Sequence, residues 1–276
     1  MKKIRLKQLC LVVFIILTSA CTTSQPKISQ PENNEDLKET VEIAPEIAED
    51  SFVEATEEIP DRPGIILNFD DYHPVAWERH FDLFDTYNAK VTFFVHEMEV
   101  AAGRKKNIFD FCLAAQKRGH EIGYHTISHP ELTTVSRGLF FEQTVSRIGI
   151  FRDAGIELTS FAYPYGTYRP WMHEELLKYY KIVRGISGHK LYTADEMKFG
   201  FLDSESIDNI RFKSDDSFQN RIDNLLKSAK DAGKIIILTS HSISGNDYGI
   251  TTKRLEYVLS KCKEYDITFY RFKDFQ

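Results

Sequence analysis

The chain has 276 residues, 42% of them hydrophobic, so it is long enough to bury a sizeable core. Its formal net charge is -6 at pH 7, and its isoelectric point is about 5.9. The part that we expect to fold contains no long run of Lys or Arg. The basic surface of a nucleic-acid-binding protein is therefore missing, and we expect no nucleic-acid partner.

The N-terminus has the layout of an export signal. Basic residues precede an apolar run over 9–17, which is too short to span a bilayer. The segment 17–21 resembles a bacterial lipoprotein cleavage box, in which the cysteine becomes the acylated first residue of the mature protein. We expect a signal peptide over residues 1–20 and a lipid anchor on Cys21, which predicts an exported lipoprotein attached to a membrane, in the periplasm or at the cell surface. A plain signal peptide with an incidental cysteine is the alternative.

Residues 22–61 are rich in Glu, Asp, Pro, Ser and Asn and show no sustained hydrophobic period. We expect residues 21–61 to form a flexible, disordered acidic tether between the anchor and a folded domain over 62–276. A solvated tail without a tethering role would have the same composition.

From residue 62 onward, short apolar runs alternate with amphipathic segments. Almost continuous apolar strands in this alternation indicate a parallel sheet covered by helices. About seven such units favour a distorted (β/α) barrel in a single α/β domain over an open sheet, although periodicity alone does not decide between them. In a barrel, functional groups gather at the C-terminal ends of the strands. The expected strands are 64–69, 91–95, 121–124, 160–163, 182–186, 234–240 and 267–270, and the expected helical segments are 77–87, 108–115, 141–148, 172–180, 218–229 and 255–262.

Acidic and imidazole side chains follow two of these strands. Asp70 and Asp71 end the first strand, and neighbouring side chains there point in different directions, so one carboxylate can bind a metal while the other faces substrate. His125 and His129 follow the third strand in a loop, because Pro130 disfavours helical geometry at His129. Two imidazoles and one carboxylate form a ligand set that leaves a catalytic zinc with an open position. An Asp-rich turn and a chance pair of histidines are the alternatives.

Two further strand ends carry groups suited to acyl chemistry. The fourth strand runs into Pro164, Tyr165 and Gly166, a rigid turn that can direct the Tyr165 N–H at a developing oxyanion. The strand 234–240 runs into His241, which places another titratable group at the same rim. An ordinary strand-ending turn and a surface histidine are the alternatives.

In this order the residues resemble the motifs of the polysaccharide deacetylases of carbohydrate esterase family four, the nodulation-factor deacetylase homology group. The segment 69–71 resembles the first motif, and 125–129 resembles the His-(Ser/Thr)-x-x-His second motif. The segment 161–166, Phe-Ala-Tyr-Pro-Tyr-Gly, resembles the third motif of the exopolysaccharide N-deacetylase branch, and His241 resembles the histidine of the fifth. The resemblance covers about residues 63–275.

The resemblance implies how these residues act. Asp70 is the implied general base, His241 is the implied general acid, and the Tyr165 N–H helps to stabilise the oxyanion. The implied activity is removal of acetyl groups from N-acetylated cell-surface or extracellular polysaccharide with N-acetylglucosamine-type units. An O-acetyl esterase with the same site and a catalytically inactive carbohydrate-binding lipoprotein on the same fold are the alternatives. A divalent metal, Zn²⁺ first and Co²⁺ or Ni²⁺ as alternatives, is the implied cofactor, held by Asp71, His125 and His129.

The sequence also departs from the family pattern. Ala162 stands where many members have an Arg beside the base, and Thr239 stands where a Leu commonly lines the acetyl-methyl pocket. We locate no Asp-rich fourth motif to support the catalytic histidine. Trp171, just past the third motif, is a candidate for stacking on a sugar ring, and local packing is the alternative.

We expect Arg184 to replace the missing cation. It lies in the apolar strand 182–186, where an unpaired guanidinium would be costly to bury, so a carboxylate partner is expected, with Asp70 as one candidate. A solvated strand end, or pairing with a structural acid, is the alternative for Arg184, and Arg211 and Arg271 are the alternative cations.

Overall fold

The structure is a computed structural model that describes residues 62–97 and 108–276. The predictions for the signal peptide (1–20), the anchor at Cys21 and the tether (21–61) fall outside these residues. Within the two described ranges, no helix is long and apolar enough to cross a membrane.

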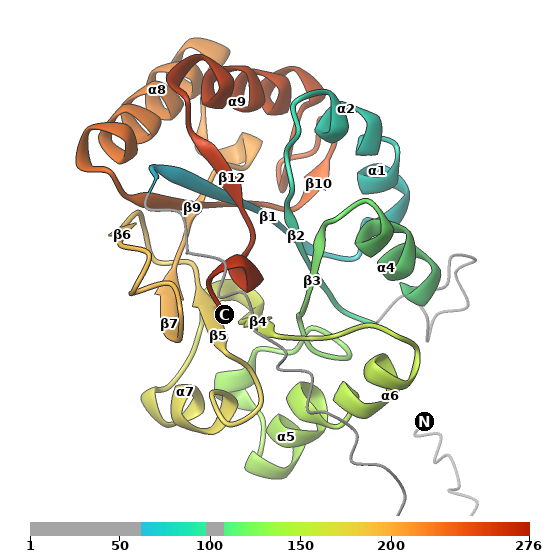
Figure 1. The fold of residues 1–276 in the computed structure, drawn as a ribbon. Coiled ribbons are helices and arrows are strands. Elements are labelled where there is room, and N and C mark those ends of the chain that lie inside the picture. Colours follow the sequence, from blue (N-terminus) through green and yellow to red (C-terminus); the bar gives the residue numbers. More distant parts are fainter. Residues whose placement is uncertain (1–61, 98–107) are drawn as a thin grey trace, which may run out of the picture. The chain divides into compact units, whose positions relative to one another are not determined.

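A curled and mostly parallel sheet forms the centre of the domain (Figure 1). Its strands are β1 (Gly64–Asp71), β2 (Thr92–Val95), β3 (Glu121–Tyr124), β4 (Ser160–Ala162), β5 (Ile182–Gly185), β6 (Leu191–Tyr192), β7 (Gly200–Asp203), β8 (Glu205–Ser206), β9 (Ile235–Ser240) and β12 (Thr268–Tyr270). The order β9, β1, β2, β3, β4, β5, β7 is parallel throughout. β12 pairs with the first half of β1, and β6 pairs antiparallel with β9. A separate small sheet joins β10 (Ser242–Ile243) to β11 (Gly249–Ile250).

The large sheet closes on itself through the segment 200–206. β7 in this segment pairs with β5, and β8 directly after it pairs with β9. The pairing therefore runs in a ring from β1 through β2, β3, β4, β5, β7–β8 and β9 back to β1. The predicted fold class, a distorted (β/α) barrel, is confirmed.

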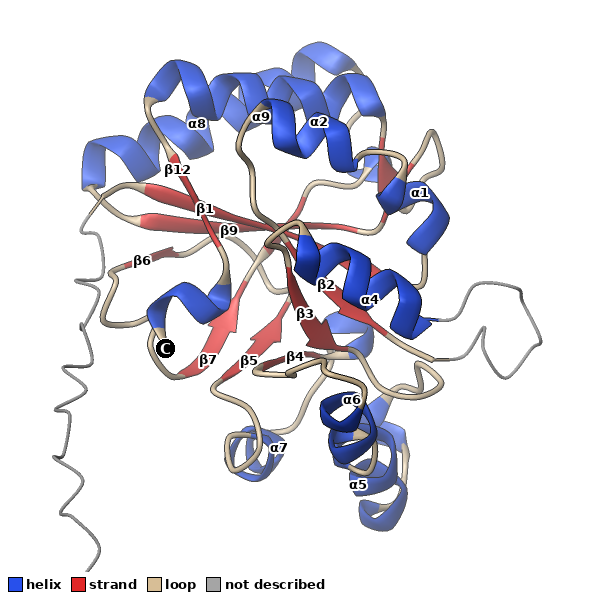
Figure 2. Cartoon of the chain, turned by 45° about the vertical axis from the view of Figure 1, so that its right-hand side comes forward, coloured by secondary structure: helices blue, strands red, loops and turns tan. Residues whose placement is uncertain are grey.

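Helices cover the outside of the sheet (Figure 2). Side chains of β1 alternate between two cores: Ile65, Leu67 and Phe69 pack in the layer beneath the helices, whereas Ile66 packs inside the barrel. The helices are α1 (Pro74–Glu78), α2 (Phe81–Thr86), α4 (Ile108–Lys117), α5 (Arg137–Val145), α6 (Ile148–Asp153), α7 (Pro170–Leu176), α8 (Asp215–Ala232) and α9 (Thr252–Tyr265). Short 3-10 turns are η1 (Leu132–Thr134), η2 (Pro164–Gly166), η3 (Asn209–Arg211) and η4 (Phe272–Phe275).

The long helix α8 shows how the sequence sets a helix and its ends. The Ser214 hydroxyl caps it by accepting from the Ser217 N–H at 3.2 Å, and Gly233 ends it with a φ of 63°, which a residue without Cβ adopts at least cost. Its buried face contains the predicted apolar residues, each of which contributes about 1.5–3 kcal/mol when fully buried. This face consists of Phe218, Ile222, Leu225, Leu226 and Ala229.

Two predicted helices are wrong in detail. The segment 77–87 forms two short helices, α1 and α2, rather than one. The segment 141–148 is divided between α5 and α6, and the fully inward positions are Phe140 and Thr144 rather than Phe141 and Val145. The Thr144 hydroxyl donates to the Phe140 carbonyl at 2.8 Å, so this polar residue is buried without needing a distant partner. A pattern that counts only apolar residues therefore selects the wrong face.

Candidate active site

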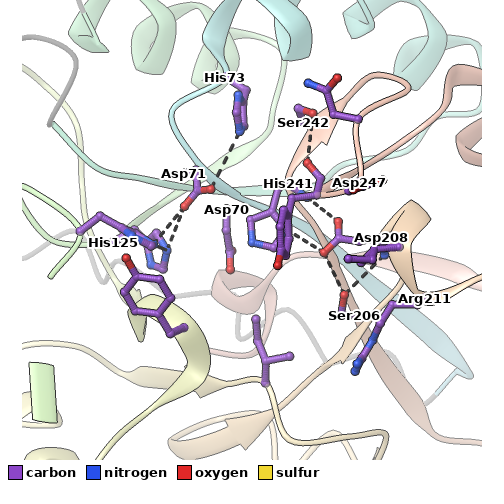
Figure 3. Close-up of a pocket in the computed structure, with 16 residues that line it drawn as sticks. Asp70, Asp71, His73, His125, Ser206, Asp208, Arg211, His241, Ser242 and Asp247 are labelled. Atoms are coloured by element: carbon purple, nitrogen blue, oxygen red, sulfur yellow. Dashed lines mark hydrogen bonds and ion pairs between the residues drawn. The ribbon is translucent and has the colours of Figure 1, made fainter. Parts of the chain in front are cut away.

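The three predicted metal ligands meet at the C-terminal ends of neighbouring strands. Asp71 ends β1, and His125 and His129 follow β3, with β2 between them. Asp71 Oδ1 lies 3.1 Å from His129 Nε2 and 3.5 Å from His125 Nε2, and the two Nε2 atoms are 3.1 Å apart. Figure 3 shows Asp71 and His125 directed toward one another. The sequence spacing therefore corresponds to one cluster in space.

The donor set of this cluster fits a divalent cation. His125 Nδ1 donates to the Ala162 carbonyl at 2.8 Å, which leaves the Nε2 lone pair directed into the cluster. Asp71 Oδ1 is buried and has no hydrogen-bond donor in the described residues. Burial raises the pKa of the Asp71 carboxyl, but the contacts with His125 and His129 and the charge of His241 hold it well below its usual range. A carboxylate and two Nε2 atoms form a three-ligand set for zinc or a similar ion.

Backbone strain is concentrated around the same cluster. Of six non-glycine residues with positive φ in the described chain, four belong to the predicted motifs: Asp71 at 85°, Thr126 at 75°, His129 at 54° and Tyr165 at 59°. Each such residue costs on the order of 1–3 kcal/mol, and strained conformations of this kind gather at functional sites. The folded barrel thus stabilises strained backbone conformations at two of the predicted metal ligands and at the predicted oxyanion donor.

Asp70 lies inside the barrel mouth and pairs with Arg184. Arg184 Nη2 contacts Asp70 Oδ1 at 2.5 Å and Oδ2 at 2.6 Å, and both side chains are almost completely buried. Arg184 on β5 is the register partner of Ala162 on β4. The cation expected at position 162 is therefore supplied at the same level of the barrel from the next strand. The guanidinium also lies over the Phe94 ring, 4.9 Å from its centroid.

The alternative cations are used elsewhere or lie apart from the base. Arg271 forms an ion pair with Asp274, three residues further along the chain. Arg211 lines the cleft but makes no ion pair with Asp70. The pairing proposed from sequence for Arg184 is the one that the structure contains.

His241 is held by Asp208, a residue that the sequence analysis missed. Asp208 Oδ2 lies 2.8 Å from His241 Nδ1, and its Oδ1 accepts from the His241 N–H at 3.2 Å and from the Ser240 hydroxyl at 2.7 Å. Ser206 donates to Oδ2 at 2.9 Å, and Trp77 Nε1 donates to the His241 carbonyl at 2.9 Å. With Nδ1 engaged by Asp208, His241 has Nε2 free to face the cleft.

The charges around His241 keep it protonated at neutral pH. Burial lowers its pKa, but the hydrogen bond and charge of Asp208, together with the charges of Asp70 and Asp71, raise the pKa to about 9. Asp208 follows β8, a strand of two residues that gives no periodic signal. An Asp after the short alternation Glu205-Ser206-Ile207 was the only sequence sign of it.

The metal ligands and the catalytic candidates share one cleft of about 1050 Å³. It is lined by Asp70, Asp71, His125, His129, Asp208 and His241. Tyr165 and Ile186 also line the cleft. Pro164 and Gly166 do not line it, but they complete the turn that contains Tyr165. Gly166, at φ 67°, lies so close to Ile186 that an added Cβ would be 3.1 Å from its backbone nitrogen. The turn therefore requires glycine and fixes the position of Tyr165.

Two further residues that the sequence analysis singled out, Trp171 and Thr239, do not line the cleft. Trp171 packs locally, with its ring 4.9 Å from that of Phe140 and the Arg137 guanidinium 4.9 Å above it, so the alternative reading of Trp171 holds. Thr239 is fully buried, with Oγ1 2.8 Å from Asn68 Oδ1 and 2.7 Å from Ser204 Oγ. Its hydroxyl is therefore satisfied inside the barrel below the catalytic groups.

Comparison with known proteins supports the same family. Residues 57–180 match the family model described as polysaccharide deacetylase. Among solved structures, the peptidoglycan deacetylase PdaC from Bacillus subtilis is 18% identical, with a TM-score of 0.53 over 78% of this chain and 91% of that one. The chitin deacetylase from the fungus Colletotrichum lindemuthianum is 16% identical, with a TM-score of 0.57 over 78% and 87%.

A third solved structure has a similar fold. It is the Xyl-CE4 domain of a multidomain xylanase from the hindgut metagenome of Trinervitermes trinervoides, 21% identical, with a TM-score of 0.56 over 78% of this chain and 89% of that one. No curated protein is similar enough in sequence to count as a match. Residues 57–180 thus match the polysaccharide deacetylase model, and the three solved structures share the fold of this chain.

Proposed function

We propose that this domain is a metal-dependent hydrolase that removes acetyl groups from N-acetylated polysaccharide, at N-acetylglucosamine-type units. The observation that carries the proposal is that one cleft contains a paired carboxylate, Asp70, an imidazole held by a carboxylate, His241, and a three-ligand metal cluster. Acyl transfer needs a base, an acid and a stabilised oxyanion together.

Asp70 serves as the base in the proposed reaction. It accepts the proton of the attacking water, and the Arg184 guanidinium, which contacts both of its oxygens, holds the carboxylate in place. The Tyr165 N–H donates to the oxyanion that develops on the acetyl oxygen. A divalent cation held by Asp71, His125 and His129, with Zn²⁺ first and Co²⁺ or Ni²⁺ as alternatives, supplies Lewis-acid polarisation of the acetyl carbonyl and lowers the pKa of water.

His241 serves as the acid and favours the amide over the ester as substrate. A departing amine must be protonated, and a pKa of about 9 keeps the His241 imidazole charged at neutral pH while Asp208 holds Nδ1. An alkoxide that leaves from an O-acetyl ester needs this acid less. The inactive carbohydrate-binding protein is the weaker alternative, because binding alone requires neither a base nor an acid.

The test uses acetylated glycans and the purified full-length chain. We expect release of acetate together with an equal amount of free amine, loss of both after treatment with a chelator, and recovery with Zn²⁺. Release of acetate without amine from an O-acetylated glycan would instead identify an O-acetyl esterase. A metal-loaded chain that releases no acetate from either class would contradict the proposal.

We also propose that the mature protein is a membrane-anchored lipoprotein acylated at Cys21. The support is the signal-like layout of residues 1–20. One acyl chain anchors weakly, so stable attachment requires the several chains of a lipoprotein N-terminus. The expected result is that the chain sediments with membranes and that Cys21→Ser releases it. Mass spectrometry that finds an unmodified N-terminus at another residue would contradict the anchor.

A further inference from the structure

The cleft continues past the groups used in the proposed reaction. Its lining includes Ile210 and Arg211 from η3 and Asn246, Asp247 and Tyr248 from the loop between β10 and β11. Figure 3 shows Asp247 and Arg211 on the opposite side of His241 from Asp71 and His125. We call the segments Asn209–Arg211 and 244–248 together the acid-side ledge.

Apolar side chains are exposed on this ledge. Among the described residues, the two most exposed large hydrophobic side chains are Tyr165 and Tyr248, each at 65%, and both line the cleft. Ile210, at 53%, lines it as well. Apolar surface gathered in a concave site marks a place where a ligand binds. Tyrosine suits such a place because a flat apolar ring carries a polar tip.

Hydrogen bonds that do not involve the Tyr248 ring connect the two segments of the ledge. Asn209 Nδ2 donates to the carbonyls of Ser244 at 3.0 Å and Asn246 at 2.8 Å, and the Ile210 N–H donates to the Asp247 carbonyl at 3.0 Å. Arg254 on α9 donates to Asn209 Oδ1 at 3.1 Å and so joins the ledge to the helical layer. A ligand that binds here does not have to order the loop first, which reduces the entropic cost of binding.

A glycine allows the loop between β10 and β11 to end close to Ser242. Gly249, directly after Tyr248, lies so close to Ser242 that an added Cβ would be 2.5 Å from the Ser242 carbonyl oxygen. No larger residue fits at this approach, so the loop returns tightly beside His241. The Tyr248 ring consequently stands at 79° to the His241 ring, with the ring centroids 6.0 Å apart.

Two charged side chains accompany Tyr248 without partners of their own. Within residues 62–97 and 108–276, neither the Arg211 guanidinium nor the Asp247 carboxylate has an ion pair or a side-chain hydrogen bond, and both line the cleft. A guanidinium offers planar donors, and a carboxylate offers acceptors. A pyranose ring has an apolar face and a rim of hydroxyls, which matches an exposed aromatic ring beside planar polar groups.

We propose that the acid-side ledge is a binding subsite for a neighbouring saccharide unit of the substrate chain, which stacks on Tyr248 and bonds through its hydroxyls to Arg211 and Asp247. This inference rests on the proposed function, because His241 Nε2 must face the nitrogen of the reacting unit. The reacting unit then lies between the metal cluster and His241, and the ledge beyond His241 receives the next unit. The domain therefore prefers oligomers to single sugars.

The test compares a β-1,4-linked tetramer of N-acetylglucosamine with the single sugar. Tyr248→Ala in the full-length chain should raise KM for the tetramer about tenfold while kcat changes far less, because the lost contact is made equally in the ground state and the transition state. The preference for tetramer over monomer in kcat/KM should fall by a similar factor. Tyr248→Phe keeps the ring and should keep most of the preference.

Tyr179→Ala is the matched control, because Tyr179 is 51% exposed but does not line the cleft. Calorimetry on Asp70→Asn, with and without Tyr248→Ala, measures tetramer binding without turnover. If the parent releases acetate and Tyr248→Ala keeps its KM for the tetramer, the subsite is wrong and the proposed function stands. If the parent releases no acetate, the proposed function fails, and tetramer binding by Asp70→Asn then decides the subsite. Weaker binding after Tyr248→Ala supports the subsite. Absence of tetramer binding overturns it.

Discussion

The two sides of the cleft are built from different kinds of sequence information. On the metal side, Asp71, His125 and His129 come from β1 and the loop after β3, and each pattern can be read from adjacent residues. On the acid side, His241 follows β9, but its partner Asp208 follows β8, 33 positions earlier in the chain. A metal centre must bring several ligands to one small ion. A histidine that acts as general acid needs only one carboxylate partner, and any nearby strand end can supply it.

The largest effect is expected on the metal side. His125→Ala removes a buried ligand, so the chain should lose its metal and its activity should fall by more than about 10³-fold, because Lewis-acid polarisation contributes several kcal/mol. Metal content by elemental analysis and released acetate are the measurements. His80→Ala is the control, because His80 lies outside the cleft and bonds to Ala76 and Thr252. Full metal content and full activity in His125→Ala would show that the site is misassigned.

The next effect is expected on the acid side. Asp208→Asn removes the charge that holds the proton on His241, so kcat should fall by about 10²-fold. The pKa of His241 is raised to about 9, so the acid is lost only as pH rises through that value. Without Asp208 the imidazole loses its proton nearer pH 6.5, and the basic limb of the pH profile should move to lower pH.

The control for this change is Asp215→Asn. Asp215 pairs with Lys253 and Arg254 and does not line the cleft. It should leave the basic limb in place and the metal bound. An unshifted basic limb in folded Asp208→Asn would remove His241 as the general acid, while a shift without loss of metal would separate the two sides of the cleft experimentally.

A smaller effect is expected from the cation beside the base. Arg184→Met should lower kcat/KM less than the two changes above, with metal content unchanged, because Asp70 loses the guanidinium that contacts both of its oxygens. Removing one partner of a buried pair also costs about 3–5 kcal/mol of stability, so circular dichroism must first show a folded protein. Arg271→Met is the control, since Arg271 pairs with Asp274 instead. A wild-type rate in folded, metal-loaded Arg184→Met would exclude Arg184 from the mechanism.

Sequence patterns predicted the barrel and the metal cluster because both depend on local order. Asp71 ends β1, and His125 and His129 follow β3, and both strands can be recognised in the sequence. Arg184 was predicted by a physical argument, since a charge within an apolar strand needs a partner. Asp208 could not be predicted, because β8 has two residues and is defined only by its pairing with β9. Barrel closure by β7 and β8, and the ledge built from η3, likewise depend on contacts between distant segments.

The strand β3 is flanked by a histidine at each end. It therefore allows a residue at the cleft to be compared with a buried residue away from the cleft on a single element. His125 follows its C-terminal end and faces the metal cluster, whereas His120 precedes its N-terminal end and is buried among Phe81, Phe84 and Phe93. In barrels the C-terminal ends carry function and the N-terminal ends carry stability. His120→Gln should therefore leave metal content and activity unchanged.

His120 should instead affect how stability depends on pH. Burial, and then the charge of Lys90, lower the pKa of His120 to about 3, while the unfolded chain titrates near 6.5. Between these values the unfolded state binds one proton more than the folded state, so acidification lowers stability across that window and has no such effect above it. Denaturant titrations at pH 7 and pH 5 should show that the parent loses on the order of 2 kcal/mol more than His120→Gln over this interval. An equal loss in the two proteins would mean that His120 is already charged in the folded barrel, and a loss of metal from His120→Gln would mean that the two ends of β3 are not independent.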